Sequence, residues 1–146
     1  MSMLQHSSRA WGSPSRYIQG RYELDNLKQH TETYGRRVFI LIDVFFYKNY
    51  AEKFEKMYAG SDSQILCEQF GGQITEEEIL RCTDLAKDLQ PDVVVGIGGG
   101  KTMDTAKAAA ALVVRPSKAP EQLAGLLKVR RAIPPFIAVP TTAGTG

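Results

Sequence analysis

Apolar runs of strand length, separated by segments of helical periodicity, dominate the pattern of the chain. Residues 38–42, 92–97 and 136–139 are rich in β-branched side chains and apolar over almost their whole length. Such continuous runs are typical of strands buried on both faces of a parallel sheet. Residues 64–70 predict one more strand. Because helical segments alternate with these strands, we predict a layered α/β fold with a mostly parallel sheet.

The segments between the strands carry helix signals. Residues 44–59 place apolar side chains at positions 46, 50, 54, 57 and 58, which is helical spacing. Thr75 and Glu78 have the spacing of a capping box, in which Thr75 caps the amide of residue 78 and Glu78 reaches back. That box opens a helix that ends before Pro91. Further helices are expected at residues 24–35, from Lys101 onward and at residues 121–128.

The two ends of the chain differ from its middle. Residues 1–16 are polar and are expected to form a flexible N-terminal arm, followed by one α/β domain over residues 17–146 that begins with a short strand at 17–20. Residues 141–146 have the composition of a loop that follows a strand, which is where α/β folds place ligand sites. A truncation at Gly146 is therefore expected.

Composition narrows the class of protein. Lys and Arg number 18 and Asp and Glu 16, and a net charge of +2 predicts neither nucleic acid nor a membrane surface as a partner. The apolar runs are far shorter than the ~20 residues of a membrane-spanning helix, and the N-terminus has no apolar signal core. The two cysteines, Cys67 and Cys82, form no disulfide framework. These features predict a cytoplasmic protein.

The segment GIGGGKT at residues 96–102 carries the strongest functional signal. A strand, a glycine turn and a helix start aim free amides and a positive helix end at one point, which suits a phosphate. The dinucleotide fingerprint GxGxxG fails at Lys101, and the P-loop pattern fails at Val95. A P-loop-like nucleotide-binding protein, a non-catalytic nucleotide-binding or interaction module, and a turn that only packs a helix on the sheet remain alternatives.

Three more places at strand or helix ends are candidates. Asp43 ends the first long strand and is suited either to bind a ribose or to cap the next helix. Asp104 lies one turn after the glycines, where it either stabilises the helix end, holds Lys101 or orients a ligand. Thr141 and Thr142 follow the last strand and offer hydroxyls either to a ligand or to a turn.

Taken together, VGIGGGKTMDTAK at residues 95–107 and AVPTTAGTG at residues 138–146 resemble the iron-containing alcohol dehydrogenase superfamily. The segment SPSRYIQG at 13–20 and the FGG at 70–72 resemble its glycerol dehydrogenase branch, whereas the PTTAGTG form resembles the broader alcohol dehydrogenase branch. The resemblance implies the N-terminal domain of the dehydroquinate synthase-like fold, Rossmann-like, with a C-terminal helical metal domain absent from this chain.

The resemblance also implies roles for residues of this sequence. Its cofactor would be NAD, bound by Asp43, Gly98, Gly99, Gly100, Lys101, Thr102, Asp104, Thr141 and Thr142. The implied reaction is oxidation of glycerol or a related small alcohol or polyol, by a possible homo-oligomer, with a divalent metal, zinc or iron, as Lewis acid. The implied metal ligands, an aspartate and histidines, have no counterpart here because no histidine follows His30. The chain alone is therefore expected to be inactive, and no catalytic residue is assigned to it.

Overall fold

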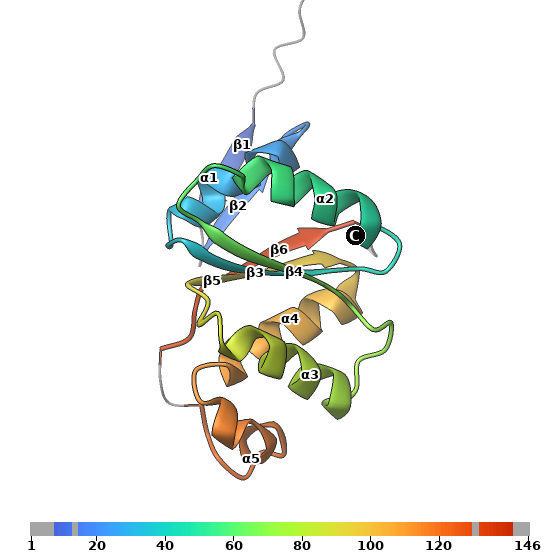
Figure 1. Cartoon of the computed structure of the whole chain (residues 1–146), viewed down its shortest axis with the longest axis vertical. Coiled ribbons are helices and arrows are strands. Elements are labelled where there is room, and N and C mark those ends of the chain that lie inside the picture. The colour runs from blue at the N-terminus through green and yellow to red at the C-terminus, as the bar shows by residue number, and fades with distance from the viewer. Residues whose placement is uncertain (1–7, 13–14, 130–131, 142–146) are drawn as a thin grey trace, which may run out of the picture.

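The computed structural model describes residues 8–12, 15–129 and 132–141. Four parallel strands form the central sheet, in the order β4 (Gln64–Gln69), β3 (Arg37–Ile42), β5 (Val93–Gly98) and β6 (Phe136–Pro140). The main helices are α1 (Leu27–Glu32), α2 (Tyr47–Tyr58), α3 (Glu76–Lys87), α4 (Gly100–Leu112) and α5 (Ala119–Leu123). Helices α1 and α2 lie on one side of the sheet and α3 and α4 on the other (Figure 1). The predicted layered α/β fold is confirmed.

The central strands are buried because each sends alternate side chains into a different layer. Along β3, Val38, Ile40 and Ile42 pack into the cluster that contains residues of α1 and α2. The side chains between them, Phe39 and Leu41, pack into the cluster that contains residues of α3 and α4. All five are fully buried. An apolar run without alternation is thus what a strand between two helical layers requires.

Small residues bring α4 close to the sheet. Ala106, Ala109 and Ala110 of α4 are buried. Opposite them, Gly96 of β5 has so little space that a Cβ atom would lie 3.0 Å from the Ala106 Cβ. The alanine-rich helix and the glycine in the middle of an apolar strand are therefore two halves of one close contact.

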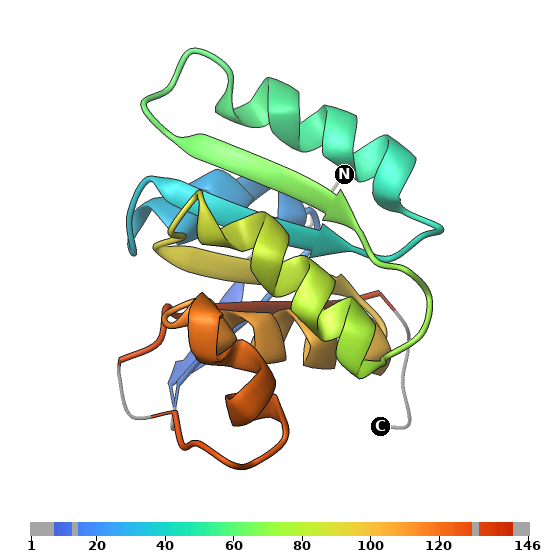
Figure 2. The ribbon, with the colours of Figure 1, turned by 60° about the horizontal axis from the view of Figure 1, so that its bottom comes forward.

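The order of the strands creates a switch point between β3 and β5. Strand β3 leads through α2 to β4 on one side, and β5 leads through α4 to β6 on the other side (Figure 2). The chain leaves the carboxyl ends of the neighbouring strands β3 and β5 toward opposite faces of the sheet (Figure 1). In open α/β sheets such a point leaves a crevice in which ligands bind.

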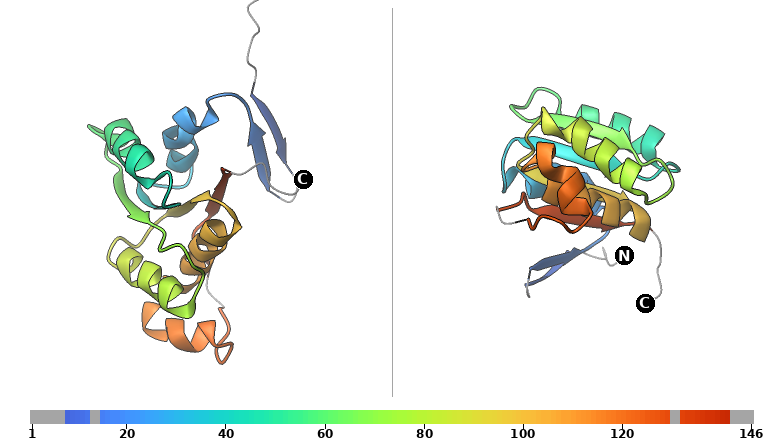
Figure 3. Two further views of the ribbon diagram at one scale, coloured as in Figure 1. Left: turned by 90° about the vertical axis from the view of Figure 1, so that its right-hand side faces the viewer. Right: turned by 90° about the horizontal axis from the view of Figure 1, so that it is seen from below.

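The expected N-terminal arm contains a strand. Strand β1 (Arg9–Gly12) pairs antiparallel with β2 (Arg16–Gln19), and the register sets Trp11 opposite Tyr17. This hairpin stands beyond the β6 side of the sheet (Figure 3). The short strand expected at residues 17–20 is present as β2, whereas the strand within the expected arm was missed. This strand is only four residues long, and its pairing depends on backbone hydrogen bonds that side-chain patterns do not show.

Two expected helices have different bounds. The segment expected at residues 24–35 is a 3-10 turn, Glu23–Asn26, followed by the short helix α1. The helix expected at 121–128 begins earlier, at Ala119, because Pro120 suits a first helical turn. It ends at Leu123, and Gly125 follows in a left-handed conformation with φ +77°. In the part of the chain that the structure describes, no helix combines the length and the apolar character needed to cross a membrane.

Candidate nucleotide-binding site

The ends of three strands converge at the switch point. The backbone N–H of Asp43 donates to the Ile97 carbonyl at 2.8 Å, one residue beyond the end of β3. On the other side of β5, the backbone N–H of Thr141 donates to the Gly98 carbonyl at 3.1 Å. The pairing of the sheet therefore continues past the strands and fixes Asp43 and Thr141 on either side of the glycine turn. Thr142 lies outside the described residues.

Gly98 and Gly100 differ in what surrounds them. Gly98 has φ +155°, and a Cβ atom there would lie 2.7 Å from the Thr102 Oγ1 and 2.9 Å from the Asp43 Cβ. No other residue fits this position without moving both neighbours. A Cβ atom on Gly100 would meet nothing within 4 Å, so the space beside Gly100 is open. Gly98 is required by the fold, whereas the protein itself does not require Gly100.

Gly99 and the first turn of α4 present free amide groups. Gly99 is the N-cap, and the Met103 N–H donates to its carbonyl at 3.1 Å, which is the first bond of the helix. The N–H groups of Gly100, Lys101 and Thr102 precede that bond, and amides at this position have no partner within a helix. Helix α4 is 13 residues long, so its dipole adds positive potential at the same point. This arrangement suits an anion.

Asp43 has the capping role that the sequence suggested, and its ribose-binding role stays a prediction. Its Oδ1 accepts from the Phe45 N–H at 3.0 Å, and its backbone carbonyl accepts from the N–H groups of Phe46 and Tyr47. It therefore caps the turn that leads into α2. Its Oδ2 lies 3.4 Å from the Thr102 Oγ1, a long contact that leaves this oxygen able to accept a shorter bond from a ligand hydroxyl. Asp43 is half-buried, and its Cβ lies beside Gly98.

Lys101 and Asp104, the charged residues at the start of α4, do not pair with each other as one sequence-based hypothesis proposed. The Lys101 Nζ donates to the Gln73 Oε1 at 3.4 Å, in the connection between β4 and α3. Asp104 is exposed, and within the described ranges no hydrogen bond or ion pair joins it to Lys101 or Lys107. The hypothesis that Asp104 holds Lys101 is therefore wrong for this structure, because the lysine extends toward the neighbouring connection. A helix-end or ligand role for Asp104 stays a prediction.

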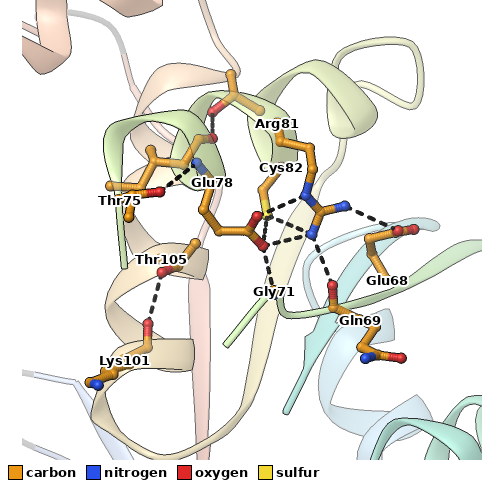
Figure 4. Close-up of polar contacts among 11 residues, drawn as sticks. Glu68, Gln69, Gly71, Thr75, Glu78, Arg81, Cys82, Lys101 and Thr105 are labelled. Atoms are coloured by element: carbon orange, nitrogen blue, oxygen red, sulfur yellow. Dashed lines mark hydrogen bonds and ion pairs between the residues drawn. The ribbon is translucent and has the colours of Figure 1, made fainter. Parts of the chain in front are cut away.

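Half of the predicted capping box is present. The Thr75 Oγ1 accepts from the Glu78 N–H at 3.1 Å, as expected. The Glu78 carboxylate does not return to Thr75 but accepts from the Gly71 N–H at 2.8 Å and from Arg81 (Figure 4). A charged guanidinium is a stronger partner than a single amide, which explains the difference. Gln73, Glu78 and Arg81 were missed as neighbours of the site, although the i,i+3 spacing of Glu78 and Arg81 was a signal.

One cavity of the described part of the chain lies away from the glycine turn. It has a volume of about 220 Å³ and is lined by residues such as Gln90, Pro91 and Pro134. Pro91 and Pro134 precede β5 and β6, so this cavity lies at the amino-terminal edge of the sheet, opposite the glycine turn. In α/β sheets the ligand edge is the carboxyl-terminal one, and the candidate site is therefore the glycine turn.

Comparison with known proteins identifies the family to which this α/β chain and its glycine turn belong. A family model described as iron-containing alcohol dehydrogenase matches residues 14–146. The chain belongs to this family of oxidoreductases. The resemblance drawn from the two glycine motifs is thus confirmed, and the P-loop alternative is not favoured.

Individual relatives narrow the comparison. The chain is 40% identical to the glycerol dehydrogenase of Thermotoga maritima over 104 residues. This aligned region covers 70% of this chain and 28% of that protein. It is 33% identical to the sulfoacetaldehyde reductase of Bilophila wadsworthia, over 85% of this chain and 31% of that protein. A solved structure, a probable glycerol dehydrogenase from Sinorhizobium meliloti 1021, superimposes with a TM-score of 0.61 at 28% identity, covering 82% of this chain and 26% of that one. The chain thus spans less than a third of the length of these relatives.

Proposed function

We propose that this chain forms the NAD-binding part of an enzyme that oxidises glycerol or a related small alcohol. The observation that carries the proposal is the convergence of Asp43, the glycine turn at residues 98–100 and Thr141 at one switch point. Relatives named glycerol dehydrogenase and sulfoacetaldehyde reductase support a small hydroxylated or carbonyl compound as the substrate class.

The residues present fit a dinucleotide. The amides of Gly100 and Lys101 bind the pyrophosphate, and the open space beside Gly100 lets the backbone approach it closely. The Asp43 Oδ2 accepts a ribose hydroxyl, and its charge disfavours a 2′-phosphate, so NAD is preferred over NADP. The Thr102 Oγ1 lies 3.4 Å from that oxygen, in the first turn of α4. The proposed set is completed by Gly98, Gly99, Asp104, Thr141 and Thr142.

The described residues fit a dinucleotide but not a metal ion. Among the residues that the structure describes, no group of three His, Cys, Asp or Glu side chains could hold a metal ion, and no histidine follows His30 in the sequence. We therefore assign no step of this chain to a metal and propose that the zinc or iron ligands lie outside it. A bound nicotinamide ring supplies the hydride acceptor. The role of this chain is to bind and orient that cofactor, and alone it does not turn over alcohol.

Two further parts of the proposal concern the cellular compartment and the oligomeric state. The two cysteines, Cys67 and Cys82, are free thiols, which supports a reducing compartment and hence the cytoplasm. Burial raises the pKa of each thiol to about 12, so neither is a reactive nucleophile at neutral pH. A homo-oligomer remains part of the proposal for the whole enzyme.

Parallel titrations of the 146-residue chain with NADH, NADPH and ATP–magnesium test the proposal. We expect saturable binding of NADH, weaker binding of NADPH, and no binding of ATP–magnesium at the same concentrations. Binding of ATP–magnesium in preference to NADH would refute the dehydrogenase assignment. Zinc or iron added with glycerol and NAD should produce no NADH above background, and clear turnover would refute the proposed inactivity of the chain alone.

A matched pair of variants tests the role of Asp43. Asp43→Asn keeps an oxygen that accepts from the Phe45 N–H but removes the negative charge. We expect it to weaken NADH binding by roughly tenfold to a hundredfold, because a hydrogen bond to a charged group is worth about 1.5–3 kcal/mol. We also expect it to narrow the preference for NADH over NADPH. Asp62→Asn removes the same charge at an exposed position between α2 and β4, at the opposite edge of the sheet, and should leave both affinities unchanged.

A further inference from the structure

A carboxylate holds the connection between β4 and α3 in place. The Glu78 side chain is only 11% exposed, and its Oε1 accepts from the Gly71 N–H at 2.8 Å. A Cβ atom on Gly71 would lie 2.8 Å from the Glu78 Oε2, so the carboxylate would have to shift to make room for any other residue. The position of residue 71 is therefore fixed by a side chain from the first turn of α3.

Arg81 ties that carboxylate to the end of β4. Its Nε donates to the Glu78 Oε2 at 2.8 Å, and its Nη2 donates to the Gln69 carbonyl at 2.9 Å (Figure 4). Its Nη1 also lies 3.3 Å from the Glu68 Oε1. The Arg81 guanidinium holds the pKa of Glu78 below its ordinary value, so the carboxylate is charged at neutral pH. We call these two residues the Glu78–Arg81 clamp.

The connection that the clamp holds also reaches the glycine turn. Gln73 lies two residues after Gly71, and its Oε1 accepts from the Lys101 Nζ at 3.4 Å. Lys101 is the second residue of α4, in the turn that presents free amides. A chain of contacts therefore runs from the clamp through residues 71–73 to a lysine at the proposed phosphate position.

We propose that Glu78 and Arg81 are positioning residues for the nucleotide site: they fix residues 71–73 so that Gln73 holds Lys101 beside the bound pyrophosphate. The inference rests on the proposed NAD-binding function. A free lysine side chain loses rotamer entropy when it binds a ligand, and one already held by a neighbour loses less. Neither clamp residue touches the cofactor in this account, and both act through Lys101.

Affinity for NADH, measured on folded variants of the 146-residue chain, tests the inference. Arg81→Lys keeps the positive charge but loses the two-pronged contact, and Glu78→Gln keeps the size of the side chain. We expect each to raise the Kd for NADH roughly threefold to tenfold, because Lys101 must then be ordered on binding. Glu77→Gln removes the same charge from the same turn of α3 at an exposed position and should leave the Kd unchanged.

A double-mutant cycle separates positioning from a general loss of stability. In the background of Lys101→Met, which itself weakens NADH binding, Arg81→Lys should have no further effect on the Kd, because it acts through the missing lysine. Additive effects in the cycle, or an unchanged Kd in Arg81→Lys, would overturn the inference while the proposed function stands. If the wild-type chain bound no NADH, the proposed function would fail and the inference with it.

Discussion

Removal of the Asp92 charge should destabilise the protein in a pH-dependent way. Asp92 precedes β5, and its Oδ2 accepts from the backbone N–H groups of Arg36 and Arg37 at 3.0 Å each. Its Oδ1 accepts from the Arg37 Nη2 at 2.8 Å, so one carboxylate joins the starts of β3 and β5. Asp92→Asn preserves the shape of the side chain but replaces one acceptor with an NH₂ group that opposes the Arg37 guanidinium.

The expected magnitude follows from the pKa of Asp92. Hydrogen bonds and charge from Arg37, with the two backbone N–H groups, lower the pKa of Asp92 from 3.8 to about 2. Because a tenfold change in an acid constant is worth about 1.4 kcal/mol, this corresponds to about 2 kcal/mol of folding free energy at neutral pH. The Arg37 side chain is 43% exposed and that of Asp92 27%, so solvent screening reduces this contribution to about 1–2 kcal/mol.

The sign of the pH dependence is fixed. The folded protein binds the Asp92 proton more weakly than the unfolded chain, so the stabilisation is complete above the unfolded pKa near 4. It is lost as the pH falls from about 4 to about 2. The difference in stability between wild type and Asp92→Asn should therefore be constant from pH 7 to pH 5 and shrink in more acidic solution.

Urea unfolding at several pH values is the assay. We expect the midpoint of Asp92→Asn to fall by roughly 1 M at pH 7, given a slope of about 1–3 kcal/mol per molar urea. Asp62→Asn, an exposed aspartate in the connection that precedes β4, is the control and should unfold with wild type. A stability difference near zero at pH 7, or one that does not shrink below pH 4, would refute the reasoning.

Two further predictions concern the site and the core. Gly98→Ala should destabilise the protein by about 1–3 kcal/mol, through strain at φ +155° and collision with Thr102. Gly100→Ala should leave the stability unchanged or raise it by up to about 1 kcal/mol, because the space beside Gly100 is open. Equal losses of stability in urea unfolding would contradict the different surroundings of the two glycines. Phe54→Ala should cost about 3–5 kcal/mol, because its ring is fully buried between α2 and the sheet, and a thermal unfolding temperature close to wild type would argue against that packing.

The sequence predicted the elements whose burial is set by local composition. Strands β3 and β5 were visible because every side chain of an apolar run must face one helical layer or the other. The cap at Thr75 was visible because its partner lies three residues away. These signals need no knowledge of distant segments.

The features that were missed depend on contacts between distant segments. Only the family resemblance placed Asp43 and the glycine turn in one site, because they are more than fifty residues apart and become neighbours only where β3 pairs with β5. The sequence predicted that the Glu78 carboxylate accepts from the Thr75 N–H, but the fold brings the Gly71 N–H within hydrogen-bond distance instead. Strand β1 likewise owes its existence to its antiparallel neighbour and not to a hydrophobic pattern.

The close contact between α4 and β5 has a mechanical consequence. Gly96 and the buried alanines of α4 have no rotatable side chains, so helix and strand cannot slide by exchanging rotamers and move as one rigid body. The amides at the start of α4 therefore keep a constant aim relative to the sheet while solvent or ligand exchanges in front of them. Within the described residues, a hinge beside the glycine turn must therefore lie in the connections that follow β3 and β4, because the contact beneath the turn has no second arrangement to adopt.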